Sequence, residues 1–113
     1  MNRKTLVALK GSISKWEKIV AGTGVDDGYR NCPLCALFIP DPSEPYPACK
    51  GCPVAARAGK GACHTTPYDL WADQFIYEDR PWHVKTKSQK AAARKELAFL
   101  KSLLPKARKA PVP

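Results

Sequence analysis

The chain has 113 residues, of which 44% are apolar, and a formal net charge of +9. This length allows one small domain, whose core would give only marginal stability. We therefore expect an additional cross-link from a metal ion or from disulfides. The N-terminal apolar stretch is too short for a signal peptide, and no stretch approaches the roughly 20 apolar residues that a membrane span needs. The composition therefore favours a soluble, cytoplasmic protein over a membrane-spanning one.

The positive charge is concentrated at one end of the sequence. Residues 1–79 contain nine Lys/Arg and nine Asp/Glu, whereas residues 80–113 contain ten Lys/Arg and one acid, Glu96. A neutral body followed by a basic end is typical of proteins with an acidic partner. Nucleic acid and membrane surfaces are the commonest partners of this kind, and we expect nucleic acid or an acidic protein.

The first predicted helix covers about residues 4–21. Apolar residues recur there at spacings of three and four, which is the pattern of an amphipathic helix. Ser14 begins a capping-box match, so the helix either runs unbroken or starts afresh at that point. Gly22 is a natural C-terminal stop. Trp16 lies on the apolar side and is predicted to belong to the core.

Two further helices are predicted in the second half of the chain. The first covers residues 67–79, because Thr66 can cap it and an aromatic face with Trp71 follows. The second covers residues 87–104, after a capping-box match that begins at Thr86. Its predicted apolar stripe is Ala93, Leu97, Leu100 and Leu104.

These elements predict a mainly α fold, a small helical domain with little β structure. Residues 1–104 should form the single domain, with residues 32–64 as its cysteine region. Four prolines in residues 36–48 predict a largely extended, non-helical linker there. Residues 105–113 are expected to be a disordered basic tail.

The cysteines form two Cys-x-x-Cys pairs, Cys32 with Cys35 and Cys49 with Cys52, separated by thirteen residues. Two residues between thiolates let both sulfurs face one ion, and two such pairs supply the four soft ligands of tetrahedral Zn²⁺. Pro53 places Cys52 directly before a short predicted helix. This layout is similar to zinc-knuckle or treble-clef modules, so we predict a structural zinc site that folds the loop region.

Other interpretations of the cysteines remain open. Cys63 or His64 could replace one of the four ligands, since a Cys₃His site is chemically acceptable. An iron–sulfur cluster also uses four cysteines, although the closely spaced ferredoxin run is missing. Disulfides would require an oxidising environment. A redox Cys-x-x-Cys enzyme would need a βαβ pattern that the sequence lacks.

Basic residues line one side of the last predicted helix. Lys87, Lys90, Arg94 and Lys101 follow one another at spacings of three, four and seven, and Lys95 flanks them. Such a row can follow a phosphate backbone. The competing interpretation is a solvated helix face without a partner.

Several short segments carry a resemblance to known proteins. They are residues 15–19 (KWEKI), 31–35 (NCPLC) and 49–54 (CKGCPV), followed by Cys63, residues 66–68 (TPY) and Trp71. On these segments the chain resembles a loose group of small cysteine-rich proteins from phage and bacterial genomes. The resemblance implies that all five cysteine positions matter, and it carries no activity with it.

The sequence therefore predicts a small zinc-stabilised binding protein, a nucleic-acid-associated accessory factor that uses its basic C-terminal helix. An alternative is a protein–protein interaction module or inhibitor that uses the apolar side of the same helix. A disulfide-stapled or iron–sulfur protein is a further alternative. We do not expect an enzyme, because a zinc ion with four protein ligands has no open position for a substrate.

Overall fold

The computed structural model describes residues 1–38, 52–58 and 66–105, and most of them are helical. The predicted mainly α fold class is thus confirmed. Within these ranges no strand forms, and the only β pairing is an isolated bridge between Asp26 and Trp82. No helix in this part of the chain is long and apolar enough to cross a membrane.

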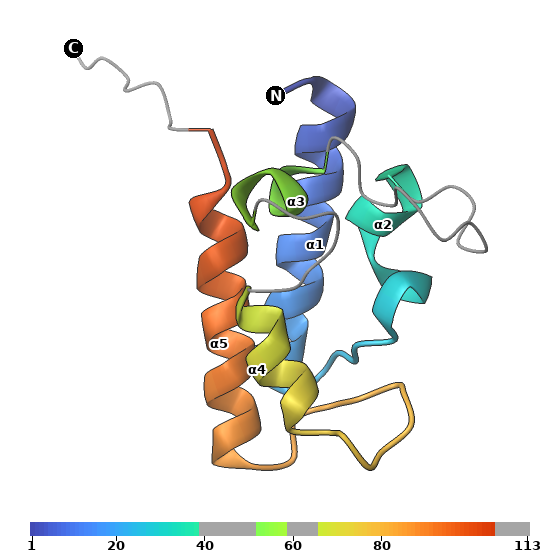
Figure 1. The fold of residues 1–113 in the computed structure, drawn as a ribbon, viewed down its shortest axis with the longest axis vertical. Helices are drawn as coiled ribbons and strands as arrows, with labels where there is room; N and C mark the ends of the chain where they lie inside the picture. Colours follow the sequence, from blue (N-terminus) through green and yellow to red (C-terminus); the bar gives the residue numbers. More distant parts are fainter. Residues whose placement is uncertain (39–51, 59–65, 106–113) are drawn as a thin grey trace.

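Two long helices form the frame of the molecule. Helices α1 (Arg3–Ala21) and α5 (Lys87–Ser102) pack against each other and run in opposite directions, as Figure 1 shows. The short helix α2 (Pro33–Phe38) packs on α1, and α4 (Pro67–Asp73) packs on α5. α2 and α4 therefore cover different sides of the pair.

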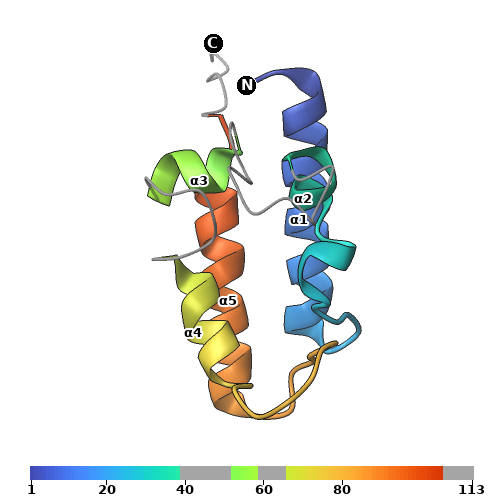
Figure 2. The same cartoon turned by 45° about the vertical axis from the view of Figure 1, so that its right-hand side comes forward.

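The remaining helix, α3 (Pro53–Ala58), crosses near the C-terminal end of α5, which is clearest in Figure 2. The Arg57 guanidinium donates from Nη1 to the Ser102 hydroxyl (3.4 Å) and from Nη2 to the Ser102 carbonyl (3.3 Å). The sequence predicts this short helix correctly, because Pro53 suits a first helical position. These bonds connect the cysteine region to the last turn of α5.

The predicted first helix is confirmed as one unbroken element. The Asn2 side chain caps it by accepting a hydrogen bond from the Thr5 amide (2.8 Å). The helix runs through Ser14 without a new start and ends at Gly22, whose φ of 86° lies in the left-handed region that glycine adopts at low cost.

Helix α2 differs from the prediction that residues 36–48 are non-helical. Residues 36–38 belong to α2, and residues 39–48 lie outside the described part of the chain. The helix forms because Pro33 fits its first turn and Leu34, 3% exposed, is buried in the core. Gly11 allows α2 to approach α1 closely, since a Cβ there would lie 3.2 Å from the Pro33 ring carbons.

The caps of the last two helices are confirmed. Thr66 caps α4, and Thr86 forms a complete capping box with Gln89. The predicted extent of the helix over residues 67–79 is wrong, because α4 ends at Asp73 and gives way to turns. Backbone hydrogen bonds between residues three apart replace the helical bonds between residues four apart there, and Phe75 lies in the core. Helix α5 ends two residues before the expected position 104.

An aromatic row forms the centre of the core, as the sequence predicts for Trp16 and Trp71. The Trp16 and Trp71 rings meet edge to face with centroids 5.2 Å apart, and Trp71 lies 4.6 Å from Phe75. Phe75 stacks on Trp82 at 4.9 Å with nearly parallel planes. These ring contacts join α1, α4 and the segment before α5. The stacking of Phe75 on Trp82 explains why the chain leaves the helix after Asp73.

Candidate functional site

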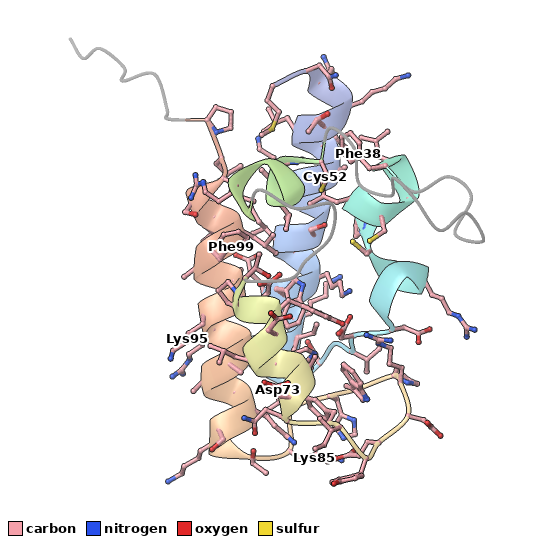
Figure 3. All side chains as sticks on the ribbon, in the orientation of Figure 1. Phe38, Cys52, Asp73, Lys85, Lys95 and Phe99 are labelled. Carbon is pink, nitrogen blue, oxygen red and sulfur yellow. The ribbon has the colours of Figure 1, made fainter. Side chains whose placement is uncertain are left out.

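The predicted basic residues all lie on the solvent side of α5. Lys87, Arg94, Lys95 and Lys101 are exposed, and Lys90 is half-buried. Figure 3 shows Lys95 pointing away from the other helices at the outer edge of α5. We call these five residues the basic face.

The opposite side of α5 is buried against α1 and α4. Ala93 and Leu100 lie there as predicted, whereas Leu97 and Leu104 are only half-buried. Glu96, only 4% exposed, also belongs to this buried side. The single acid of residues 80–113 therefore does not neutralise the basic face.

Carboxylates pair with the basic face at one position only, within the ranges that the structure describes. Lys101 Nζ lies 3.8 Å from a Glu17 carboxylate oxygen, and both side chains are about half-exposed. An exposed pair at this distance contributes little to stability. The basic face thus retains nearly all of its charge toward solvent.

The buried Glu96 carboxyl is unusual in its surroundings. Its Oε1 atom has no hydrogen-bond partner, and neither does the hydroxyl of Ser12, which is 3% exposed on α1. Burial, with a smaller contribution from the negative charge of Asp26, raises the pKa of Glu96 to about 8. Lys15 opposes this shift without cancelling it. Glu96 is therefore mostly protonated at neutral pH.

The first cysteine pair has the local geometry of a thiolate site. Cys32 immediately precedes α2, and the Cys35 backbone N–H donates to Cys32 Sγ (3.2 Å). The hydrogen bond from the Cys35 side chain lowers the pKa of the Cys32 thiol to about 6, with burial opposing it. Backbone amides and the Lys15 charge act in the same direction as Cys35. A thiol that ionises this readily suits metal ligation.

The predicted zinc site extends beyond the described residues. Cys52 is buried (5% exposed), and Figure 3 shows it between α3 and α2. Cys49, Cys63 and His64 lie outside the ranges that the structure describes. Within those ranges no three His, Cys, Asp or Glu side chains are grouped to hold a metal ion. Three of the four predicted ligands, Cys32, Cys35 and Cys52, lie within those ranges, and they are not gathered in this way. The four-ligand site thus stays a prediction.

Asp26, which is 0% exposed, accepts hydrogen bonds from four groups. Its Oδ1 accepts hydrogen bonds from Lys15 Nζ and from the Gly28 amide, both at 2.9 Å. Its Oδ2 accepts from the Tyr68 hydroxyl (2.8 Å) and from Trp71 Nε1 (2.9 Å). We call these five residues the Asp26 network. Each oxygen has two donors, so the carboxylate is fully satisfied.

Charge and hydrogen bonding determine the ionisation of the Asp26 network. Burial alone would raise the pKa of Asp26, but the Lys15 charge and the donated hydrogen bonds outweigh it and lower the pKa below its usual value. Burial and the neighbouring Asp26 carboxylate raise the pKa of the Tyr68 hydroxyl. A carboxylate with four fixed donors has no room for a substrate, so this network positions the elements rather than reacting.

Sequence reasoning missed the role of Asp26. The residues around it predict a simple Asp-Gly turn, and its three side-chain donors come from positions 11, 42 and 45 residues away along the chain. No protein-family description, no curated protein and no solved structure matches this chain. The candidate sites therefore depend on their own geometry.

Proposed function

We propose that this protein is a small nucleic-acid-associated binding protein that contacts phosphate groups with the basic face of α5. One observation carries the proposal: four of the five basic side chains are exposed, while Glu96, the only acid of α5, points into the core. Surface charge of one sign along a rigid helix attracts a polyanion and releases its counterions on binding.

The spacing of the basic face suits a nucleic-acid backbone. Lys87 and Lys101 are fourteen positions apart, which corresponds to about 21 Å along a helix. A single strand of duplex DNA presents a phosphate roughly every 3.4 Å of axis, so a row of this length faces about six phosphates. We infer contacts with about four of them, which predicts sequence-independent binding through the backbone.

We further propose that the cysteine region holds a structural zinc ion, with Cys32, Cys35, Cys49 and Cys52 as ligands and Cys63 or His64 as alternates. The Cys35 amide on Cys32 Sγ supports this, because it stabilises a thiolate that the ion would need. Such an ion would hold α2 and α3 together and supply no reaction, and we propose no enzymatic activity.

The alternative of an interaction module based on the apolar side of α5 is less well supported. Ala93, Leu100 and Leu103 on that side are 0%, 2% and 8% exposed, because α1 and α4 cover them. A partner could reach them only if the core opened. A docking role would therefore need another surface.

The experiment is a salt titration of binding to a short DNA duplex and to an RNA of equal length. Four phosphate contacts predict that the affinity for DNA falls about 100-fold between about 50 and 200 mM salt. Replacing Lys87, Arg94, Lys95 and Lys101 by glutamine should abolish most of this dependence.

The matched control replaces the four exposed basic residues of α1 by glutamine, which lowers the net charge by the same amount. Those residues are Arg3, Lys4, Lys10 and Lys18. The control should keep most of the affinity for DNA and most of its salt dependence. Equal losses in both variants would mean that only the total charge matters, and this would refute a role of the basic face.

A further inference from the structure

We propose that the groove between α1 and α2 docks an acidic amphipathic helix of a partner protein. The groove has a volume of about 630 Å³, and its surface is mostly apolar. It lies on the α2 side of α1, and α5 packs elsewhere on α1. This site is independent of the basic face proposed above.

The shape of the groove suits a helix. Ala8 and Ala36 have small side chains, so the backbone of another helix can come close to them. Val7 and Leu37 also line the groove and provide larger apolar surface. Val7 is 62% exposed, which is a high value for a large apolar residue and leaves it available for burial by a partner.

The charge at one end of the groove selects an acidic partner. Arg3 and Lys4 line that end and are exposed, and neither has a carboxylate partner among the described residues. All residues lining the groove are apolar or basic. The N-terminal end of α1 adds the positive end of its helix dipole. A second copy of this chain would bring a net charge of +9 to the same place, so a self-association is disfavoured.

Two synthetic helical peptides serve as probes. Both carry leucines at spacings of three and four on one side, and they differ only in having glutamates or lysines on the flanks. Binding is followed by fluorescence anisotropy of labelled peptide. We expect the glutamate peptide to bind and the lysine peptide to bind at least roughly tenfold more weakly, because only the former complements Arg3 and Lys4.

The variant Val7→Glu tests the position of the bound peptide. Glutamate is a good helix former at this exposed site, and it would neutralise the basic end of the groove, so we expect a loss of at least roughly tenfold in affinity with an unchanged melting curve. Ile76→Glu is the matched control, since Ile76 is 67% exposed and lies outside the groove. It should leave the affinity within about twofold.

Several results would overturn the proposal. Equal binding of the two peptides would remove the charge argument, and unchanged binding by Val7→Glu would remove the site. Loss of peptide binding in the glutamine variant of α5 would assign the peptide to the basic face instead. A dimer that Val7→Glu dissociates would identify a second copy as the occupant. Failure of nucleic-acid binding would leave this proposal unaffected.

Discussion

The buried acid of α5 gives the sharpest test of the fold. Glu96 is 4% exposed, its Oε1 has no hydrogen-bond partner, and its pKa is raised from 4.5 to about 8. A raised pKa means that the folded protein binds the proton more tightly than the unfolded chain does. Stability from this group is therefore fully present below pH 4.5 and is lost as the pH rises toward 8.

The magnitude follows from the two pKa values of Glu96. Between pH 5 and pH 7 the free energy of unfolding should fall by about 2.5 kcal/mol because of this group alone, and the decline should level off above about pH 8. Glu96→Gln removes the titration while keeping the shape of the side chain. We expect the variant to lack this decline, so the difference between the two proteins grows with pH.

The assay is urea unfolding followed by tryptophan fluorescence at a series of pH values from about 5 to 9. The control is Glu17→Gln, which removes an acid that is 54% exposed on α1 and should keep the wild-type slope. If Glu96→Gln showed the same pH dependence as the wild type, Glu96 would not be a buried, neutral acid. The packing of α5 against α1 would then be wrong.

Other consequences concern the Asp26 network, the cysteines and the first helix. Asp26→Asn should destabilise the protein by about 3 kcal/mol or more in urea unfolding, because it leaves the Lys15 ammonium, 10% exposed, without its counter-charge; a loss below about 1 kcal/mol would contradict the network. Since the pKa of Asp26 is lowered, its stabilising contribution is present above pH 3.8 and is lost as the pH falls below that value, so wild type and Asp26→Asn should converge in acid. Cys52→Ser should lower both the zinc content and the melting temperature of protein purified under reducing conditions. An unchanged zinc content would exclude Cys52 as a ligand. Iron in the wild-type protein would support an iron–sulfur cluster, and paired thiols would support disulfides. Gly22→Ala should cost about 1 kcal/mol in thermal unfolding because of its φ of 86°, and no cost would mean that α1 ends differently.

Local signals predicted α1, α3, α4 and α5, whereas α2 was not predicted. Caps such as Thr66 and Thr86 act within one turn, so the sequence alone identifies where α4 and α5 begin. The end of α4 could not be predicted in this way. It depends on the stacking of Phe75 on Trp82, a contact between segments that only the folded chain brings together.

The candidate sites also differ in whether local sequence or long-range contacts define them. The basic face was predictable because the spacing of its basic residues and their exposure both follow from the amphipathic pattern of one helix. Glu96 was not identified as a core residue, since a lone acid among lysines and arginines suggests a surface position. Asp26 was missed because its side-chain donors come from α1 and α4, far away in the sequence. When distant residues donate the hydrogen bonds to a buried charge, the sequence around that charge shows no pattern.

The basic face of α5 is proposed to contact nucleic acid. The most direct measurement is a map of backbone amide chemical shifts while a short DNA duplex is added to the full chain at low salt. We expect the shifted amides to cluster at Lys87, Arg94, Lys95 and Lys101, with α2 and the segment around Asp26 unaffected. Shifts centred on α1 and α2, or no binding at low salt, would contradict it.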